Sequence, residues 1–133
     1  MADGSELSPK IRALELMKSG NMDEAISVLT TLIDADPDDA EIHTYLGMAY
    51  HKKGDRLHSI HHFEEALRND ESARSYYNLG MVYEYAHRID EAVREYQVAL
   101  SLDPGYKKAE EALARLKSQF ESVRQVNDSP VEQ

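Results

Sequence analysis

The sequence predicts an all-α fold, a right-handed α-solenoid of three helical hairpins closed by a C-terminal capping helix. The first observation is that large apolar side chains recur at helical spacing, as Leu79 and Tyr83 do. The second is that the pattern repeats, because Leu46 and Gly47 return as Leu79 and Gly80 after 33 residues. A repeat of this length in helix-turn-helix units is typical of stacked hairpins.

Capping and turn residues divide the chain. Ser8 with a proline behind it is a good helix start, and Gly20 and Gly54 suit the ends of helices. Asp-Pro pairs at Pro37 and Pro104 close two of the hairpins, because the residue before proline avoids the α region. The expected segments are a disordered N-terminus (1–5), a degenerate first hairpin (6–39), a second hairpin (40–72), a third hairpin (73–106), a capping helix (107–126) and a disordered tail (127–133).

Three places depart from the repeat. Arg12 and Glu15 are polar where later copies are apolar, so we expect a capping first repeat with the stack beginning within this chain. The junction 69–72 is one residue shorter than the others and lacks proline, which predicts an irregular turn. His87 stands where the other hairpins carry glycine, so we expect a local adjustment if that turn requires positive φ.

The composition excludes several classes of function. The net charge of −10 argues against a nucleic-acid-binding protein, since phosphates are neutralised by clustered Lys and Arg. No apolar run approaches the length of a membrane span, so we expect no membrane insertion. The N-terminal residues lack the features of a secretory signal and cysteine is absent, so we expect a cytoplasmic protein.

No catalytic motif is present. There is no Gly-rich phosphate loop, no G-x-S-x-G elbow and no cysteine nucleophile, so we predict neither an enzyme nor a cofactor. His58 and His62 are one helical turn apart and are weak candidates for a metal site, which ordinarily needs a third protein ligand. We expect these two histidines, with His61, to lie on an exposed polar face that becomes charged below about pH 6.5. We therefore predict no metal site.

From Glu6 to Tyr106, and in the closing helix, the repeat resembles the tetratricopeptide repeat (TPR) family. The resemblance implies a protein-interaction adaptor or scaffold, in which the first helices of the hairpins line a concave groove that captures an extended peptide or a helix of another protein. Carried over position by position, the expected groove residues are Lys10, Leu14, Lys18, Thr44, Tyr45, Met48, Lys52, Arg74, Tyr77, Asn78, Met81, Tyr85, Lys108 and Arg115.

The expected groove is apolar along its middle and basic at its sides. Leu14, Met48 and Met81 occupy equivalent positions, flanked by Tyr45 and Tyr77, and such side chains adapt to a partner. Six basic residues against three acidic ones give the groove a positive excess on an acidic protein. A partner segment that is acidic with apolar anchors therefore fits. The alternative is that the Met and Tyr residues only pack between helices while the lysines solvate a rim.

A more specific function that the resemblance could imply is not matched by the residues of this sequence. Some tetratricopeptide domains are similar to one another in a clamp of Lys, Asn and Arg that grips the C-terminal carboxylate of a chaperone. Lys10, Arg74 and Asn78 fall near such places, but Leu14 and Tyr45 replace both expected asparagines and Asn78 replaces the expected arginine. We therefore do not predict recognition of a chaperone C-terminus.

A second hypothesis is a self-associating structural module that assembles through its end helices. Phe120 and Val123 on the apolar side of the last helix would then form the contact, giving a homo-oligomer.

Overall fold

The computed structural model describes residues 7–128, and within them the chain forms helices and no strands. The predicted disordered ends, 1–5 and 127–133, lie outside this range except for residues 127 and 128, which are helical instead. The helices are α1 (Pro9–Lys18), α2 (Met22–Ala35), α3 (Ala40–Lys53), α4 (Arg56–Asn69), α5 (Ala73–Tyr85), α6 (Ile89–Leu102) and α7 (Lys107–Asp128).

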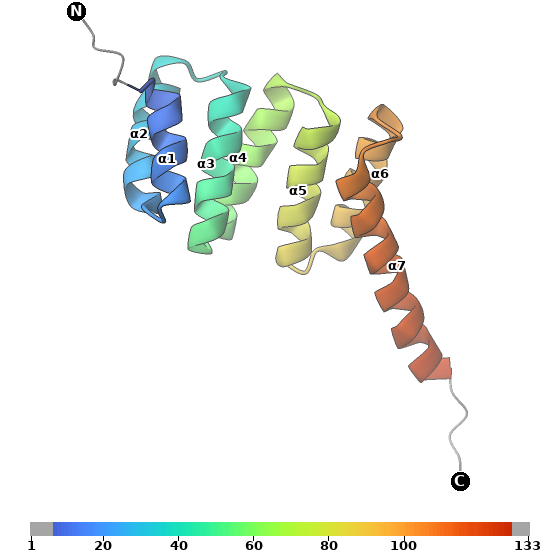
Figure 1. Ribbon diagram of the computed structural model, residues 1–133. Coiled ribbons are helices and arrows are strands. Elements are labelled where there is room, and N and C mark those ends of the chain that lie inside the picture. The colour runs from blue at the N-terminus through green and yellow to red at the C-terminus, as the bar shows by residue number, and fades with distance from the viewer. Residues whose placement is uncertain (1–6, 129–133) are drawn as a thin grey trace, which may run out of the picture.

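The helices form two layers. In Figure 1, α1, α3, α5 and α7 lie in front, and α2, α4 and α6 lie behind them. Each front helix packs closely on the rear helix that follows it, and each rear helix packs on the front helix of the next hairpin. This confirms the predicted all-α solenoid of three hairpins with a closing helix. We call the surface of α1, α3, α5 and α7 the front face.

The helix ends follow the sequence signals. Side chains of Ser8, Asp39, Asp55 and Ser72 accept a hydrogen bond from the backbone N–H three residues later, which satisfies donors that a helix start leaves unpaired. The short junction is irregular as predicted, because the Ser72 N–H donates to the Asp70 carbonyl two residues back.

The turn at His87 differs from our expectation. His87 adopts φ of 61°, beside 86° at Gly20 and 81° at Gly54. The turns at Gly54 and His87 also make equivalent backbone hydrogen bonds. The N–H of Asp55 donates to the carbonyl of Tyr50, and the N–H of Arg88 donates to the carbonyl of Tyr83. The turn therefore does not adjust to the histidine, and the histidine accepts a left-handed backbone.

Small residues let the two helices of a hairpin approach closely. A Cβ atom added at Gly47 would lie 2.7 Å from ring atoms of Phe63, and one at Gly80 would lie 2.7 Å from a ring atom of Tyr96. Both rings are almost wholly buried. The repeated glycine is therefore a packing requirement rather than a turn signal.

The core consists of two clusters of buried apolar residues, and Met48 packs against both. The apolar residues of α1 and of the segment before it are unevenly buried. Leu7 and Ile11 are about half exposed, whereas Ala13 and Met17 are buried.

The last turns of α7 extend beyond the body of the molecule (Figure 1). Its first half is anchored by the buried residues Ala109, Ala112 and Leu116. Further along, Phe120 and Val123 are 68% and 60% exposed. No helix in the described part of the chain is both long and apolar enough to span a membrane.

Candidate functional site

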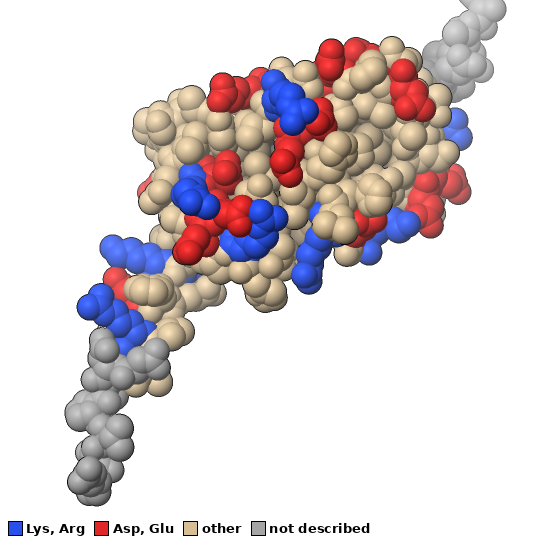
Figure 2. All heavy atoms as spheres, turned by 180° about the vertical axis from the view of Figure 1, so that it is seen from behind, with Lys and Arg blue, Asp and Glu red and all other residues tan. Residues whose placement is uncertain are grey.

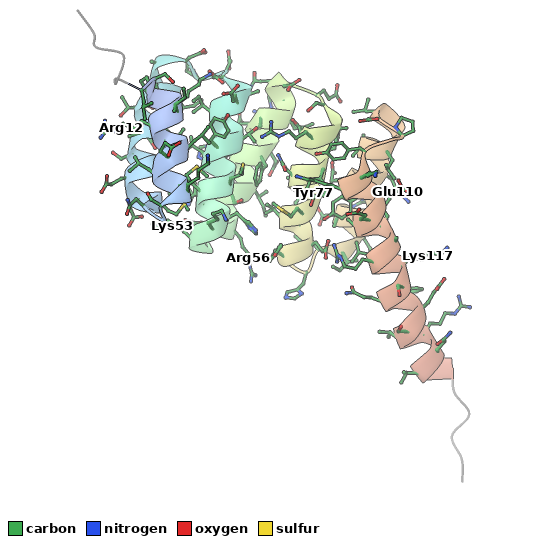
Figure 3. All side chains as sticks on the ribbon, viewed as in Figure 1. Arg12, Lys53, Arg56, Tyr77, Glu110 and Lys117 are labelled. Carbon is green, nitrogen blue, oxygen red and sulfur yellow. The ribbon has the colours of Figure 1, made fainter. Side chains whose placement is uncertain are left out.

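A hollow that involves several of the expected groove residues lies on the front face, toward the turns between the paired helices. In Figure 3, Arg56 lies at the lower end of the α3–α4 hairpin and Tyr77 lies on α5 beside α7. The hollow has a volume of about 640 Å³, within the usual range for ligand sites. We call it the turn-end pocket; its lining residues are Arg56, Tyr77, Met81, Glu84, Tyr85, His87, Tyr96 and Arg115.

A carboxylate network forms one wall of the turn-end pocket. Arg115 donates two hydrogen bonds to Glu84, from Nη1 to Oε2 at 2.5 Å and from Nη2 to Oε1 at 3.0 Å. The Tyr96 hydroxyl donates to Glu84 Oε1 at 2.9 Å. The Arg115 guanidinium holds the pKa of Glu84 below its usual value, and burial, with Glu84 beside it, raises the pKa of Tyr96. Glu84 is therefore an ionised carboxylate whose charge is already matched.

Aromatic side chains form the apolar wall. The Tyr77 ring packs against Tyr96, with 5.6 Å between ring centroids, and against Tyr106 at 5.8 Å. Tyr85 is 61% exposed, and its ring makes a T-shaped contact with His51, with 4.6 Å between the ring centroids. Tyr77 is thus fixed by the core, while Tyr85 offers a free surface to a ligand.

A shallower depression adjoins the turn-end pocket and is lined by Tyr77, Lys108, Glu111, Ala112 and Arg115. The Lys108 ammonium lies 5.9 Å from the centroid of the Tyr77 ring. Tyr77 and Arg115, two expected groove residues, thus line both hollows.

The N-terminal half of the front face is arranged differently. Lys10 Nζ lies 2.9 Å from Asp39 Oδ2, so its charge is paired within the protein. The Tyr45 hydroxyl donates to Glu41 Oε1 at 3.0 Å, and burial is the main cause of its raised pKa. Leu14 and Met48 are half-buried against core clusters. This half of the front face does not contribute to the turn-end pocket.

One expected groove residue does not present a polar group to a partner. Thr44 is buried, with 8% exposure, and its hydroxyl donates to the Ala40 carbonyl one turn back. Its helix was assigned correctly, but its side chain does not reach the surface. Asn78, in contrast, is partly exposed.

Most of the expected basic residues keep an unpaired charge. Of the six, Lys10 and Arg115 are engaged by carboxylates. The other four make no ion pair within residues 7–128 and are exposed: Lys18, Lys52, Arg74 and Lys108. Four of the six basic residues expected in the groove therefore keep a charge that no carboxylate within residues 7–128 pairs with.

Sequence reasoning missed Arg56 and His87. Arg56 is the first residue of α4, a second helix of a hairpin, and we assigned the groove to first helices alone. His87 lies in a turn. The signal for His87 was present, because a histidine at a position otherwise occupied by glycine is unusual in a left-handed turn.

We had expected His58, His61 and His62 to lie on an exposed face, but His62 does not. His43 is 6% exposed and its Nδ1 lies 3.1 Å from Nδ1 of His62, which is partly buried. The ring of His62 also stacks on Tyr50 at 5.5 Å. Burial lowers the pKa of His62 to about 4, so it stays neutral where an exposed histidine would be protonated.

His58 and His62, the weak candidates for a metal site, make contacts with different partners. His58 Nδ1 lies 2.7 Å from Asp55 Oδ2, and its ring stacks on Tyr50. His62 is directed toward His43 instead. Among residues 7–128 no group of three or more His, Cys, Asp and Glu side chains is arranged to hold a metal ion.

The rear face has a different character. Figure 2 shows acidic and basic side chains interspersed among other residues on this side. Two pairs on the rear helices are Arg68 with Glu65 and Arg88 with Glu91. Side chains of both charges therefore lie close together on this side.

Models of known protein families match three ranges of this chain. Residues 13–54 match a model described as TPR repeat, and residues 40–72 and 73–106 each match a model described as Tetratricopeptide repeat. The chain belongs to the tetratricopeptide repeat family. The matches to 40–72 and 73–106 coincide with the second and third hairpins, whereas the match to 13–54 begins within α1 and extends through α3.

Among curated proteins the chain is similar to Superkiller complex protein 3 of Homo sapiens, with 32% identity over 74 residues. The matched region is 55% of this chain and 5% of that protein, so the likeness concerns a small part of a much longer relative.

Two solved tetratricopeptide structures have the same arrangement. The second TPR domain of human RPAP3, in complex with the HSP70 peptide SGPTIEEVD, superposes with a TM-score of 0.76 at 27% identity. That match covers 83% of this chain and 92% of the RPAP3 domain. The first TPR of Spaghetti (RPAP3), bound to the HSP90 peptide SRMEEVD, gives a TM-score of 0.78 at 24% identity, covering 84% and 92% of the two chains.

Proposed function

We propose that this protein is a protein-interaction adaptor that captures a segment of a partner protein on its front face, and that the segment is acidic with apolar anchors. The observation that carries the proposal is the turn-end pocket, where Tyr77, Met81 and Tyr85 lie beside Arg56 and other basic groups. An apolar wall next to an unpaired cation suits a ligand that combines an apolar group with an acidic one.

The charges of the front face favour this class of partner. Lys52 and Arg74 are exposed and have no acidic partner within residues 7–128, on a chain whose net charge is −10. A locally positive surface on an acidic protein attracts acidic segments and repels basic ones, which affects the association rate and the specificity.

The relatives support a protein ligand. The peptide SGPTIEEVD in the complex with the human RPAP3 domain contains Glu and Asp together with Ile and Val. This is the combination of acidic and apolar side chains that we propose for the partner here. The peptide need not be the same one, because Leu14 and Tyr45 replace the asparagines of the chaperone clamp.

The test is selection of binders from a random peptide library displayed on phage, followed by calorimetry with the selected peptides. We expect Asp or Glu near apolar residues to be enriched. The Lys52→Glu/Arg74→Glu variant should bind these peptides at least about tenfold more weakly. Both side chains are exposed, so the fold should be unaffected.

The matched control is Arg12→Glu/Arg94→Glu, which makes the same charge change at exposed sites outside the pocket and the expected groove. It should bind the peptides as the wild type does. Selected peptides without acidic residues, or equal losses in both variants, would contradict capture by the expected groove residues.

These variants are preferable to changes of Met48 or Tyr77. Met48 packs against both core clusters and Tyr77 against one of them, so a charge at either site would also destabilise the fold.

A second candidate function is self-association through α7. Phe120, Val123 and Val126 are 68%, 60% and 75% exposed on the part of the helix that leaves the body. Exposed apolar side chains on one segment are typical of contact surfaces. Light scattering on the full chain should then give a dimer or larger species, and Phe120→Glu should return it to a monomer. A wild-type monomer at all accessible concentrations would exclude this function.

A further inference from the structure

The turn-end pocket contains a strained residue. His87 adopts φ of 61°, a left-handed conformation that is disfavoured for a residue with a Cβ atom. The same turn is made by glycine at Gly20 and Gly54, with equivalent backbone hydrogen bonds. The turn itself therefore does not require a side chain at this position.

The His87 side chain lines the turn-end pocket. Backbone strain at a position where glycine would serve is commonly retained where the side chain takes part in binding. The strain and the pocket are independent observations, and they coincide at one residue. This coincidence points to His87 as a contact of the ligand.

The basic groups of the pocket come from three separate elements. Arg56 begins α4, His87 lies in the α5–α6 turn, and Arg115 projects from α7. Glu84 is the one carboxylate among the lining residues, and Arg115 already neutralises it. Arg56 is exposed and has no acidic partner within residues 7–128. The pocket therefore retains one unmatched positive charge beside its aromatic wall.

The arrangement of the lining residues determines what they can hold. Tyr77, Met81 and Tyr85 supply apolar contact, and the His51 ring supports the exposed Tyr85 ring. An apolar side chain fits this wall, and a carboxylate next to it in sequence can reach Arg56.

Building on the proposed front-face capture, we propose that the turn-end pocket is the specificity site of the groove. It takes one apolar side chain of the partner together with an adjacent Asp or Glu, whose carboxylate pairs with Arg56 and accepts a hydrogen bond from His87. The site joins the end of the second hairpin, the turn of the third and α7, so its formation depends on the position of the capping helix.

The first experiment compares affinity with stability for His87→Gly. Removing the left-handed histidine should raise the melting temperature by a few degrees, since glycine adopts this backbone without strain. The same change should weaken binding of the phage-selected peptides about fivefold, because one hydrogen bond is lost. A purely structural role for His87 predicts the higher melting temperature with unchanged affinity.

The second experiment is a double-mutant cycle between Arg56→Gln and a peptide whose acidic residue is replaced by its amide. Each change alone should reduce affinity about tenfold, and the two together should cost little more than either one. Arg94→Gln, an exposed arginine of α6, is the matched control and should leave the affinity unchanged.

The outcomes separate this inference from the proposed function. If Lys52→Glu/Arg74→Glu abolishes binding while Arg56→Gln and His87→Gly do not reduce it, the groove captures peptides but the turn-end pocket is not the specificity site. If none of these variants changes the affinity, or no peptide is selected, both proposals are wrong. Additive losses in the cycle would show that Arg56 does not contact the carboxylate.

Discussion

The Arg115 guanidinium of α7 donates two hydrogen bonds to the Glu84 carboxylate of α5, joining residues 31 positions apart in the sequence. The Tyr96 hydroxyl of α6 donates to the same carboxylate. One acidic side chain therefore ties together three helices that border the turn-end pocket. The orientation of the capping helix and the shape of the pocket depend on the same contacts.

Replacing Arg115 with glutamine should loosen α7. The change removes a two-point ion pair to a carboxylate that is 20% exposed, and we expect a loss of about 1 kcal/mol in the free energy of unfolding, allowing for solvent screening. Urea unfolding measures the loss, and hydrogen exchange should show faster exchange in α7. Lys117→Gln, on the same helix, is the control, and a similar loss there would mean that Glu84 has no special role.

Replacing Gly80 with alanine should destabilise the third hairpin. The added Cβ would lie 2.7 Å and 2.8 Å from two ring atoms of Tyr96, and 3.2 Å from the Ala92 carbonyl oxygen, which cannot rotate away. Overpacking of this kind costs about 1–3 kcal/mol and outweighs the better helix propensity of alanine. Thermal unfolding of Gly80→Ala should show a lowered midpoint.

Gly105→Ala is the comparison for this substitution, since its new Cβ would meet only a side-chain oxygen of Asp103 at 3.6 Å. We expect little change in stability there. An equal or larger loss at Gly105 would show that the interhelix contact at Gly80 is not the cause.

The hydrogen bonds of the buried histidine pair determine its tautomers. His43 Nε2 lies 2.7 Å from the Pro37 carbonyl oxygen, which can only accept, so this nitrogen carries the proton. In the neutral pair, His43 Nδ1 then accepts from the Nδ1–H of His62 at 3.1 Å. Both rings are thereby satisfied without a charge.

Acid should weaken the fold through His62. Its pKa is about 4 in the folded protein against a usual value of 6.5, chiefly because burial disfavours the charged ring, with His61 and His43 adding to the effect. The unfolded chain therefore takes up a proton first, and stability falls as the pH drops from about 6.5 to about 4. We expect a contribution on the order of 1–2 kcal/mol after allowance for solvent screening.

The measurement is urea unfolding of wild type and His62→Gln at about pH 7 and about pH 5. The wild type should lose more stability between the two conditions than the variant does. Equal losses would assign the acid sensitivity to other groups, among them His51, whose pKa is also lowered by burial.

The fold was largely predictable because its signals are local and repeated. Ser8, Ser72 and Gly54 act through hydrogen bonds within a few residues, so their roles follow from the sequence alone. The repetition of Gly47 as Gly80 then fixed the register of the hairpins. Repetition also compensated for the weak first copy.

The site was less predictable because it depends on contacts between elements. Thr44 lies on the expected helix, yet neighbouring helices bury it. His62 was expected to be exposed. It is instead partly buried and lies against His43, 19 residues earlier in the sequence. Arg56 and His87 enter the pocket from a second helix and a turn, which a rule about first helices does not cover.

Capture of an acidic segment at the front face is the central proposal, and chemical-shift mapping tests it directly. A selected acidic peptide would be titrated into ¹⁵N-labelled protein. If the front face captures the peptide, chemical-shift changes should concentrate in α3, α5 and α7 and at His87. These changes should be lost in the Lys52→Glu/Arg74→Glu variant. Shifts confined to α2, α4 and α6, or to the exposed end of α7 around Phe120, would contradict capture at the front face.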